Sequence, residues 1–340
     1  MPRQLPTPAR GVVDFFSRAL SSFQQSNSKF QVICTAVPSR HCLGSHHVEP
    51  ALFPPTKAPR TIVVLDSSFN PPTRAHLSMA TSALLDLSRK HDQDLSAMRL
   101  LLLLSVNNAD KGVKPAAFDK RLAMMWAFAG DVLSSVGIQG NSSTSEASTT
   151  HEAREGKEGL SVDIGLTTVP YFHEKSAALD ADRYYRGGDD SKGAEHPDQV
   201  FLVGYDTLIR IFNPKYYNPP SSAASVTRTG PESTPMRDAL DPFFRRAWLR
   251  VTPRLGDEWG GSHEQSQYLQ NLLHGDGLEK VGGVKDWGKR IELVEGRSVG
   301  GHIISSTHAR AAAKSRDLDK LDAMVTPGVR WWIEQEDLYQ

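Results

Sequence analysis

The chain has 340 residues, of which 39% are hydrophobic and 23% are charged. This composition is typical of a soluble globular protein with enough apolar residues for a substantial core, in one large or two ordinary domains. The 39 basic residues balance the 39 acidic ones. No global charge therefore favours a nucleic acid or an acidic membrane as partner, and any anion site must be built locally.

Cysteine use and the length of the apolar runs exclude two further classes of protein. Cys34 and Cys42 are too few for a disulfide framework and fit a reducing compartment. The longest apolar stretch, residues 100–104, suits one buried strand and is far too short for a membrane span. Because the N-terminus lacks the order of a secretory signal, we expect a cytoplasmic or nuclear protein, with a mitochondrial presequence as the alternative.

The N-terminal region predicts a helix, a short strand and a linker. Apolar residues in 11–23 recur at the spacing of one helix face, which must dock on the rest of the chain. Residues 29–37 predict a short strand or an extended segment, and the proline-rich residues 38–59 predict a linker. Three histidines lie close to Cys42, but their spacing matches no familiar zinc-ligand pattern, so we interpret this cluster as part of the linker.

From residue 60 onward, apolar runs alternate with helical patterns. The alternation predicts an α/β fold, a Rossmann-like doubly wound parallel sheet with helices on both faces. Ligands of such sheets bind outside the carboxyl ends of the strands. We accordingly divide the chain into residues 1–59, the helix plus linker, and a domain of residues 60–340. The expected strands are 62–65, 100–106, 162–169, 200–203, 248–251 and 291–294, and the expected helices are 76–90, 117–133 and 206–212.

Two other patterns complete the predicted domain. Residues near 139–159, 182–197 and 218–235 have compositions that cannot build a core, and we expect disordered surface loops there. Towards the C-terminus, residues 318–325 present one apolar helix face and Pro327 opens a final helix. We expect a small C-terminal helical cap that buries Val329, Trp332 and Ile333.

The turn after the first of these strands carries unusual chemistry. Residues 65–77 read LDSSFNPPTRAHL, and the two prolines forbid continuation of the strand. Thr73 is the expected N-cap of the next helix, which places His76 at the third helical position. The free N–H groups and positive dipole end of that helix attract phosphate, and a histidine there can add a donor to the same anion. Taken alone, the stretch is equally compatible with an ordinary turn.

A second hydroxyl-rich helix start lies far away in the sequence. Residues 302–316 read HIISSTHARAAAKSR, in which Ser305, Ser306 and Thr307 stand where a helix begins. Arg310 follows Thr307 by three residues and therefore shares the face of that first turn. Hydroxyls, helix N–H groups and a guanidinium together make a strong phosphate site.

The segments SFNPPTRAH and ISSTHAR together resemble the (H/T)xGH and ISSTxxR signatures of the nucleotidyltransferase superfamily. Within it, SFNP followed by T-x-x-H is similar to the nicotinamide-mononucleotide adenylyltransferases, and the fused N-terminal helix is most similar to their fungal members. The resemblance implies a nucleotide-binding enzyme of NAD biosynthesis, which transfers an adenylyl group from ATP to nicotinamide mononucleotide and releases pyrophosphate. It implies Mg²⁺ held mainly by the ATP phosphates, with ATP and the mononucleotide as partners. From the balanced charge and the short apolar runs we expect neither a nucleic acid nor a membrane as partner. The choice between nicotinamide and nicotinate mononucleotide, and the oligomeric state, stay open.

The resemblance also implies roles for individual residues. His76, Arg310 and Lys111 would be catalytic, with Lys114 as the alternative lysine. The segment FLVGYD resembles the family's G-x-D, and WLRVTPR resembles a segment ending in an arginine, either Arg250 or Arg254. The implied substrate-binding and ATP-binding residues are Ser67, Ser68, Phe69, Asn70, Thr73, Lys114, Gly204, Asp206, Arg254, Ser305, Ser306 and Thr307.

The chain departs from the family pattern at three places. Ser67 and Ala75 stand where relatives usually have glycine, and the tryptophan expected after the third strand is missing. The chain has Tyr171 and Phe172 after this strand instead, and each of them can either stack on a ring or pack in the core. These departures leave two alternatives: a nucleotidyltransferase with another acceptor, such as a cytidylyltransferase or phosphopantetheine adenylyltransferase, or a non-catalytic nucleotide-binding adaptor.

Overall fold

A computed structural model of the chain describes residues 7–38, 48–107, 116–141, 159–187, 196–217, 234–253, 262–294 and 304–340. Several predicted features lie outside these ranges. They are the histidine cluster around Cys42, the two candidate lysines Lys111 and Lys114, Arg254, and most of the three expected insertions.

The centre of the molecule is a seven-stranded sheet in the order β1-β4-β3-β2-β5-β6-β7. Strands β2 to β7 pair in parallel, which confirms the predicted doubly wound sheet, whereas β1 pairs antiparallel with β4 at one edge. All the strands expected from the sequence are present, including the short one in residues 29–37. The strands are β1 (Phe30–Ala36), β2 (Thr61–Asp66), β3 (Met98–Ser105), β4 (Ser161–Thr167), β5 (Asp198–Gly204), β6 (Ala247–Thr252) and β7 (Ile291–Leu293).

The three helices expected between the strands are present as α2, α3 and α5, whereas the sequence patterns do not predict α4, α6, α7 or α8. Among the described residues, no helix combines the length and the apolar character needed to cross a membrane. The helices are α1 (Thr7–Gln25), α2 (Arg74–His91), α3 (Phe118–Asn141), α4 (Phe172–Ala181), α5 (Tyr205–Ile211), α6 (Pro235–Arg246), α7 (Ser262–Leu273), α8 (Gly277–Lys280), α9 (Ser306–Ser315), α10 (Leu318–Met324) and α11 (Pro327–Gln335), with short 3-10 turns η1 (Leu95–Ala97), η3 (Tyr184–Arg186), η4 (Pro214–Tyr216) and η5 (Lys285–Arg290).

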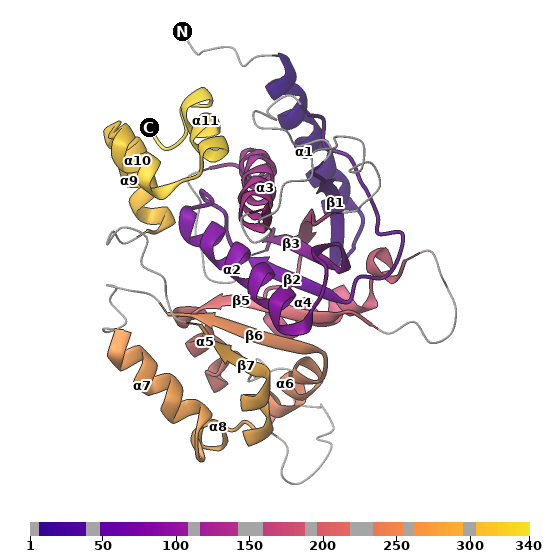
Figure 1. Ribbon diagram of the computed structural model, residues 1–340, viewed down its shortest axis with the longest axis vertical. Helices are drawn as coiled ribbons and strands as arrows, with labels where there is room; N and C mark the ends of the chain where they lie inside the picture. Colours follow the sequence, from indigo (N-terminus) through magenta and orange to yellow (C-terminus); the bar gives the residue numbers. More distant parts are fainter. Residues whose placement is uncertain are drawn as a thin grey trace.

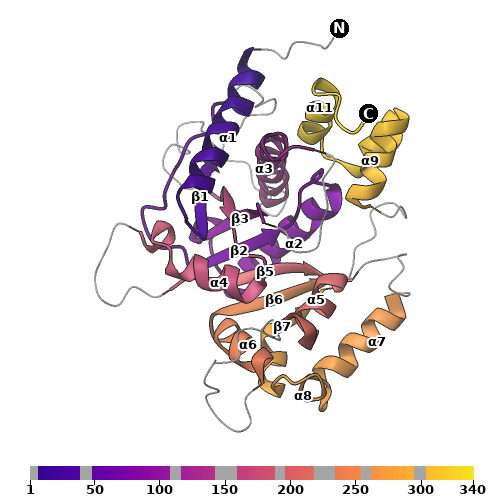
Figure 2. The ribbon, with the colours of Figure 1, turned by 180° about the vertical axis from the view of Figure 1, so that it is seen from behind.

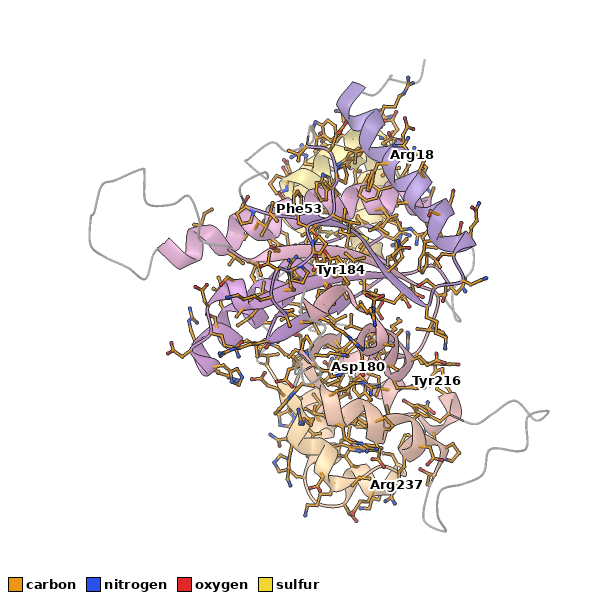
Figure 3. The ribbon with its side chains drawn as sticks, turned by 90° about the vertical axis from the view of Figure 1, so that its right-hand side faces the viewer. Arg18, Phe53, Asp180, Tyr184, Tyr216 and Arg237 are labelled. Carbon is orange, nitrogen blue, oxygen red and sulfur yellow. The ribbon has the colours of Figure 1, made fainter. Side chains whose placement is uncertain are left out.

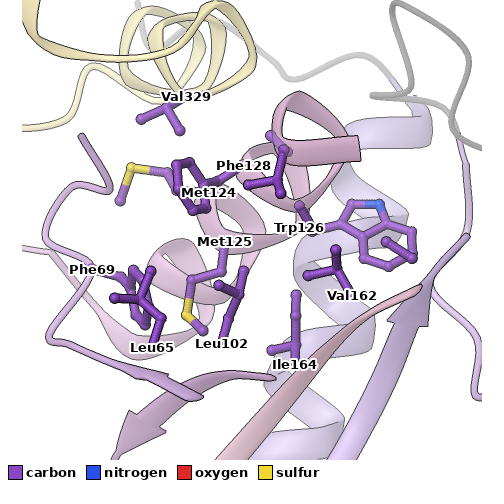
Figure 4. Close-up of a cluster of buried hydrophobic side chains, with 14 of the residues drawn as sticks. Leu65, Phe69, Leu102, Met124, Met125, Trp126, Phe128, Val162, Ile164 and Val329 are labelled. Atoms are coloured by element: carbon purple, nitrogen blue, oxygen red, sulfur yellow. The ribbon is translucent and has the colours of Figure 1, made fainter. Parts of the chain in front are cut away.

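Helices cover both faces of the sheet and enclose two apolar cores. One face carries α1, α2, α3 and the C-terminal helices, and the other carries α5 to α8 (Figures 1 and 2). Successive residues of a strand point to opposite faces, so Leu65 and Leu102 enter the first core while Val64 and Leu101 enter the second. Figure 4 shows part of the first core, where side chains of α3 meet those of the sheet. Burial on both faces explains why the central strands are continuous apolar runs.

The N-terminal helix is part of the first core. Helix α1 packs along α3, burying Val12, Phe16 and Phe23, as the apolar spacing predicts. A hydrogen bond from Ser17 Oγ to Asp119 Oδ2, 2.9 Å long, joins the two helices at their edge. Because α1 and β1 belong to the same core and sheet as the rest, nothing in this packing marks a break at residue 59. The division there stays a prediction.

A buried polar network holds β1 to the sheet. Asp163 of β4 is fully buried and accepts hydrogen bonds from Thr35 Oγ1 (2.7 Å), Arg99 Nη1 (3.1 Å) and Tyr185 OH (3.0 Å). Tyr184 also donates to this carboxylate (3.2 Å), and its position can be followed in Figure 3. Tyr184 and Tyr185 form η3, at the start of the second expected insertion. These residues therefore belong to the folded body, which corrects the boundary predicted at residue 182.

The C-terminal helices form the expected cap. Helix α11 packs on α3, and Val329, Trp332 and Ile333 are buried as predicted. Pro327 occupies the first turn of α11, where its missing N–H costs nothing. The cap is tied to α3 by the backbone N–H of Gly328, which donates to Asp131 Oδ2 at 3.2 Å.

The strand order fixes where a ligand would bind. From β2 the chain builds β3 and β4 on one side, and it then crosses back to place β5, β6 and β7 on the other side. The order reverses between β2 and β5. In an open parallel sheet, the loops at the carboxyl ends of two such strands separate and leave a crevice. The two loops that border it here begin at Ser67 and at Gly204.

Candidate active site

The loop between β2 and α2 has a constrained backbone. Phe69 has a φ of 43°, in the left-handed region that side chains other than glycine rarely occupy. Its ring is fully buried in the first core, with its centroid 5.6 Å from that of His76. Asn70 and Thr73 are also buried. These three side chains therefore shape the loop from within, while Ser67, Ser68 and His76 are half-buried at its surface.

Thr73 is the N-cap of α2 and His76 is the third residue of the helix, as predicted. The backbone N–H of Thr73 donates to His76 Nδ1 at 3.0 Å. An atom that accepts this hydrogen bond carries no proton, so neutral His76 carries its proton on Nε2. Nε2 lies 3.0 Å from Ser67 Oγ. The helix start thus holds the imidazole with an N–H donor directed at the loop, which is the orientation that an anion needs.

Helix α9 begins in the way that the second motif predicts. Ser305 is the N-cap, and its Oγ accepts the backbone N–H of His308 at 3.2 Å. Thr307 is exposed, and its Oγ1 accepts a hydrogen bond from Arg310 Nη2 at 3.2 Å. Hydroxyl and guanidinium therefore share the first turn of the helix.

The structure brings the two motifs together. Arg310 Nη1 donates to the carbonyl oxygen of Asn70 at 2.8 Å, and Ser306 Oγ donates to the carbonyl oxygen of Pro71 at 2.8 Å. The residues joined in this way are 240 and 235 positions apart in the sequence. Because Asn70 and Pro71 stand just before α2, the N-terminal turns of α2 and α9 meet at one place. Two positive helix ends, an imidazole donor and a guanidinium make this the strongest candidate anion site among the described residues.

The predicted G-x-D segment lies on the other side of the crevice. Gly204 ends β5, which pairs with β2, and Asp206 stands in the first turn of α5. Asp206 Oδ1 would lie 2.9 Å from a Cβ atom added to Gly204, closer than real Cβ atoms approach. A side chain at position 204 would therefore force the Asp206 carboxylate to move from where it now lies. The substrate contacts predicted for both residues stay predictions.

Arg250 is placed away from the crevice. It is buried inside β6, where its guanidinium binds Glu292 of β7 at 2.8 Å and also binds Asp86 of α2. Its hydrogen-bonding capacity is thus used between elements of the fold, which removes Arg250 as the alternative phosphate ligand. Arg254, the preferred candidate, lies outside the described residues.

The two aromatic candidates after β4 have different surroundings. Phe172 packs edge-to-face on Phe201 in the second core, with ring centroids 5.7 Å apart. Tyr171 is half-buried and stacks on His173 with centroids 5.8 Å apart. Both residues are half-buried and each ring already contacts another ring, so the choice between Tyr171 and Phe172 for stacking on a mononucleotide stays open.

One buried ion pair at the crevice is missed by the sequence analysis. Lys175 Nζ of α4 binds Asp66, the last residue of β2, and the two side chains are 5% and 9% exposed. The ammonium also lies 5.2 Å from the centroid of the Phe172 ring. The pair fixes the strand end directly before Ser67. An acidic residue at the end of an apolar strand indicates that a buried carboxylate needs a cationic partner, but it does not indicate which residue that partner is.

Among the residues that the structure describes, carboxylates at this edge do not assemble a metal site. The described residues contain no group of three or more His, Cys, Asp or Glu side chains that could hold a metal ion. Asp66 is already neutralised by Lys175. These residues fit a metal that is held mainly by the oxygens of a bound nucleotide and by water, and they do not fit a protein cage.

Comparisons with known proteins give one relative with significant sequence similarity. The chain is 29% identical over 258 residues to a protein of Schizosaccharomyces pombe named "Putative nicotinamide mononucleotide adenylyltransferase", covering 76% of this chain and 78% of that protein. No protein-family model matches the chain.

Solved structures show weaker likenesses. A nicotinic acid mononucleotide adenylyltransferase of Plasmodium falciparum, complexed with NaAD, has a TM-score of 0.39 and 12% identity, covering 82% of this chain and 97% of that one. Thermotoga maritima TmcAL, bound with alpha-thio ATP, has a TM-score of 0.31 and 12% identity, and the match covers 82% of this chain and 56% of that one. Likenesses with TM-scores below 0.5 are too weak to support a conclusion about this chain. The sequence relative, in contrast, confirms the resemblance that the two motifs imply: over three quarters of its length, the chain is similar to a protein named as a nicotinamide mononucleotide adenylyltransferase.

Proposed function

We propose that the protein transfers the adenylyl group of ATP to nicotinamide mononucleotide, forming NAD and pyrophosphate. The observation that carries the proposal is the meeting of the two motifs, in which Arg310 and Ser306 of α9 bind the loop that leads into α2. This arrangement concentrates positive potential at the switch point of the sheet, where the triphosphate of a nucleotide would lie. The similarity to the Schizosaccharomyces pombe protein supports the choice of reaction.

The chemistry suits the residues that the site contains. A phosphate oxygen of the mononucleotide attacks the α-phosphorus of ATP, and the bond from that phosphorus to the pyrophosphate oxygen breaks. The attacking oxygen is already anionic at neutral pH, so the step needs positioning and charge stabilisation more than a general base. His76 Nε2–H and the Arg310 guanidinium would bind the phosphates and stabilise the charge that accumulates on the leaving pyrophosphate.

Mg²⁺ would enter as part of the Mg-ATP substrate. When bound, it neutralises charge on the phosphate oxygens. The protein's share is then to hold the triphosphate against the two helix starts. The hydroxyls of Ser305 and Thr307 would donate to the phosphates, and Lys111 or Lys114 would add a positive charge. Ser306 would contribute its backbone N–H, because its hydroxyl already donates to the Pro71 carbonyl.

One contact favours a second candidate function. Ser67 Oγ lies on His76 Nε2, at the place where relatives of this motif have glycine. A hydroxyl there competes with phosphate for the imidazole proton. A non-catalytic protein that binds a nucleotide would tolerate this competition, whereas a transferase needs the donor to be available to the leaving group.

A direct assay separates the two functions. Purified protein is incubated with Mg-ATP and either nicotinamide or nicotinate mononucleotide, and dinucleotide is measured by chromatography. His76→Ala should lower kcat by about 100-fold or more, because it removes a donor to developing charge. Its melting temperature should stay close to that of the parent.

The matched control for this assay is His91→Ala. His91 is exposed at the opposite end of α2, so its loss should change neither activity nor stability. Near-normal turnover in His76→Ala would contradict the catalytic assignment. Measurable Mg-ATP binding without dinucleotide from either acceptor would establish the non-catalytic alternative.

A further inference from the structure

The segment that follows α11 folds back onto the loop of the first motif. Tyr339 OH donates a hydrogen bond to Asn70 Oδ1 at 2.8 Å, across 269 positions of sequence. The residues on either side of Tyr339 are anchored as well. Leu338 is buried and its N–H donates to the Ile333 carbonyl at 3.0 Å, and Gln340 Oε1 accepts from Arg316 Nη2 at 2.8 Å.

The backbone of this segment is held in a costly conformation. Asp337 and Tyr339 have φ values of 44° and 72°, both in the left-handed region. Each such residue costs about 1 kcal/mol or more and persists only where its surroundings determine it. The packing of Leu338 between them supplies that determination. The direction of the Tyr339 side chain is therefore set by the fold.

The hydroxyl of Tyr339 is the donor of this hydrogen bond. Burial raises the pKa of the Tyr339 phenol above its ordinary value, and the guanidiniums of Arg121 and Arg310 oppose this only in part. The phenol therefore keeps its proton at neutral pH. The Asn70 amide presents Oδ1 to the hydroxyl, and an amide oxygen can only accept.

Asn70 is held from two sides by groups that come from different elements. Tyr339 binds its side chain, and Arg310 Nη1 binds its carbonyl oxygen at 2.8 Å. Asn70 itself is buried, so water does not replace either contact. Because the Asn70 side chain and the Asn70 carbonyl carbon are attached to the same Cα atom, a fixed side chain restricts where the carbonyl that accepts from Arg310 can lie. The hydroxyl of Tyr339 and the guanidinium of Arg310 are thus linked through one residue.

We propose that Tyr339 is a positioning residue for the phosphate site. Its hydroxyl fixes Asn70, and the carbonyl of Asn70 in turn fixes the guanidinium of Arg310. The proposal rests on the function proposed above, in which Arg310 binds the triphosphate. It adds a contribution from the segment after α11, a part of the chain that contains neither motif. Tyr339 itself touches no substrate in this arrangement.

The test compares Tyr339→Phe with Tyr185→Phe. Both variants keep the ring and lose one buried hydroxyl bond, but the Tyr185 hydroxyl binds Asp163 inside the polar network and not the loop of the first motif. Tyr339→Phe should lower kcat/KM for ATP about tenfold, as misplacement of one charged group does. Tyr185→Phe should lower the melting temperature while kcat/KM stays within about twofold. Equal losses of kcat/KM in the two variants would reduce Tyr339 to a structural residue and overturn the proposal.

A second background shows whether the effect passes through Arg310. In Arg310→Lys, the guanidinium that Tyr339 positions is absent, so adding Tyr339→Phe should change kcat/KM by less than about twofold. If the tenfold loss persists in that background, Tyr339 acts by another route and the proposal is wrong.

Affinity for Mg-ATP, measured by calorimetry, keeps this test separate from the proposed reaction. Tyr339→Phe should weaken Mg-ATP binding about threefold or more, while Tyr185→Phe should leave it unchanged. If the parent protein makes no dinucleotide, the proposed function fails, and the affinities alone decide the positioning role. Unchanged affinity in Tyr339→Phe would then overturn it.

Discussion

At the scale of single residues, the candidate site depends on side chains whose partners restrict what they can do. His76 keeps one tautomer because the backbone N–H of Thr73 occupies Nδ1. Phe69 and Thr73 are buried, so they support the site from below and do not line it. Sequence motifs identify such positions but do not separate the residues that face a ligand from those that hold the loop in shape.

The buried pair between Lys175 and Asp66 leads to a prediction about stability. Lys175→Met leaves the Asp66 carboxylate buried without its partner, which should cost about 3–5 kcal/mol of unfolding free energy. The double variant Lys175→Met with Asp66→Asn should recover part of this loss, because no charge then stays buried. Urea unfolding followed by circular dichroism measures both values. Lys215→Met, which alters an exposed lysine, serves as the control; if it proves as damaging as Lys175→Met, the pair has no special weight.

His173 leads to a prediction about pH. Burial is the main cause that lowers its pKa below 6.5, with Arg246 adding to the effect and Glu174 opposing it. The unfolded chain therefore binds a proton at His173 more readily than the folded protein does, and stability falls as the pH drops through about 6.5. The loss levels off below the folded pKa. His173→Gln should flatten this part of the profile of unfolding free energy against pH.

The slope, and not the absolute stability, is the quantity to compare, since His173→Gln also loses ring contacts with Tyr171 and Tyr217 at every pH. His274→Gln is the matched control, because His274 is exposed after α7. The range to compare runs from about pH 5 to about pH 6.5, just below the reference pKa of histidine. If the slope of unfolding free energy against pH is the same there in His173→Gln as in the parent, another group titrates in this range.

At the scale of elements, Arg250 joins three elements of the fold, α2, β6 and β7. Its buried guanidinium binds Asp86 of α2 and Glu292 of β7, and it sits on β6 between them. Helix α2 presents His76 at its other end. The position of α2 relative to β6 and β7 thus depends partly on the side chain of Arg250.

Arg250→Ala should lower the unfolding free energy by about 3 kcal/mol, because it empties a buried site and releases two carboxylates. Arg89→Ala removes an exposed partner of the same Asp86, 3.8 Å away, and should cost less than about 1 kcal/mol. Guanidinium chloride titrations of the two variants give the comparison. Similar losses in both would mean that the buried clamp adds nothing beyond a surface pair.

Elements differ in how far their sequences reveal them. Strands β2, β3 and β5 were predictable because both of their faces are buried, which leaves uninterrupted apolar runs. Helices α2 and α3 were predictable from their apolar spacing. Helix α6 was missed because Pro242 stands inside it, where a proline normally indicates a break. Helix α7 was missed because only one side of a polar sequence is buried, at Gln265, Leu269 and Leu272.

At the scale of the whole molecule, the sequence predicts the architecture and the meeting of the two motifs. The alternation of strands and helices placed Ser67 and Gly204 at the carboxyl ends of two strands. The strand order, which brings these two ends together, came from the structure. Contacts between distant segments were not predictable in this way. Nothing in the local pattern around Arg250, Lys175 or Tyr339 reveals that each meets a partner far along the chain, since these pairs depend on how α4, β6 and the C-terminal cap are oriented.

The junction of α9 with the loop before α2 has a consequence for how the protein is made in the cell. Residues 67–76 leave the ribosome long before residues 305–310, yet the anion site requires both. A nascent or prematurely terminated chain that lacks α9 also lacks Ser306 and Arg310, the two side chains that bind the loop before α2. We therefore expect such fragments to bind Mg-ATP more weakly than the finished protein and to make no dinucleotide.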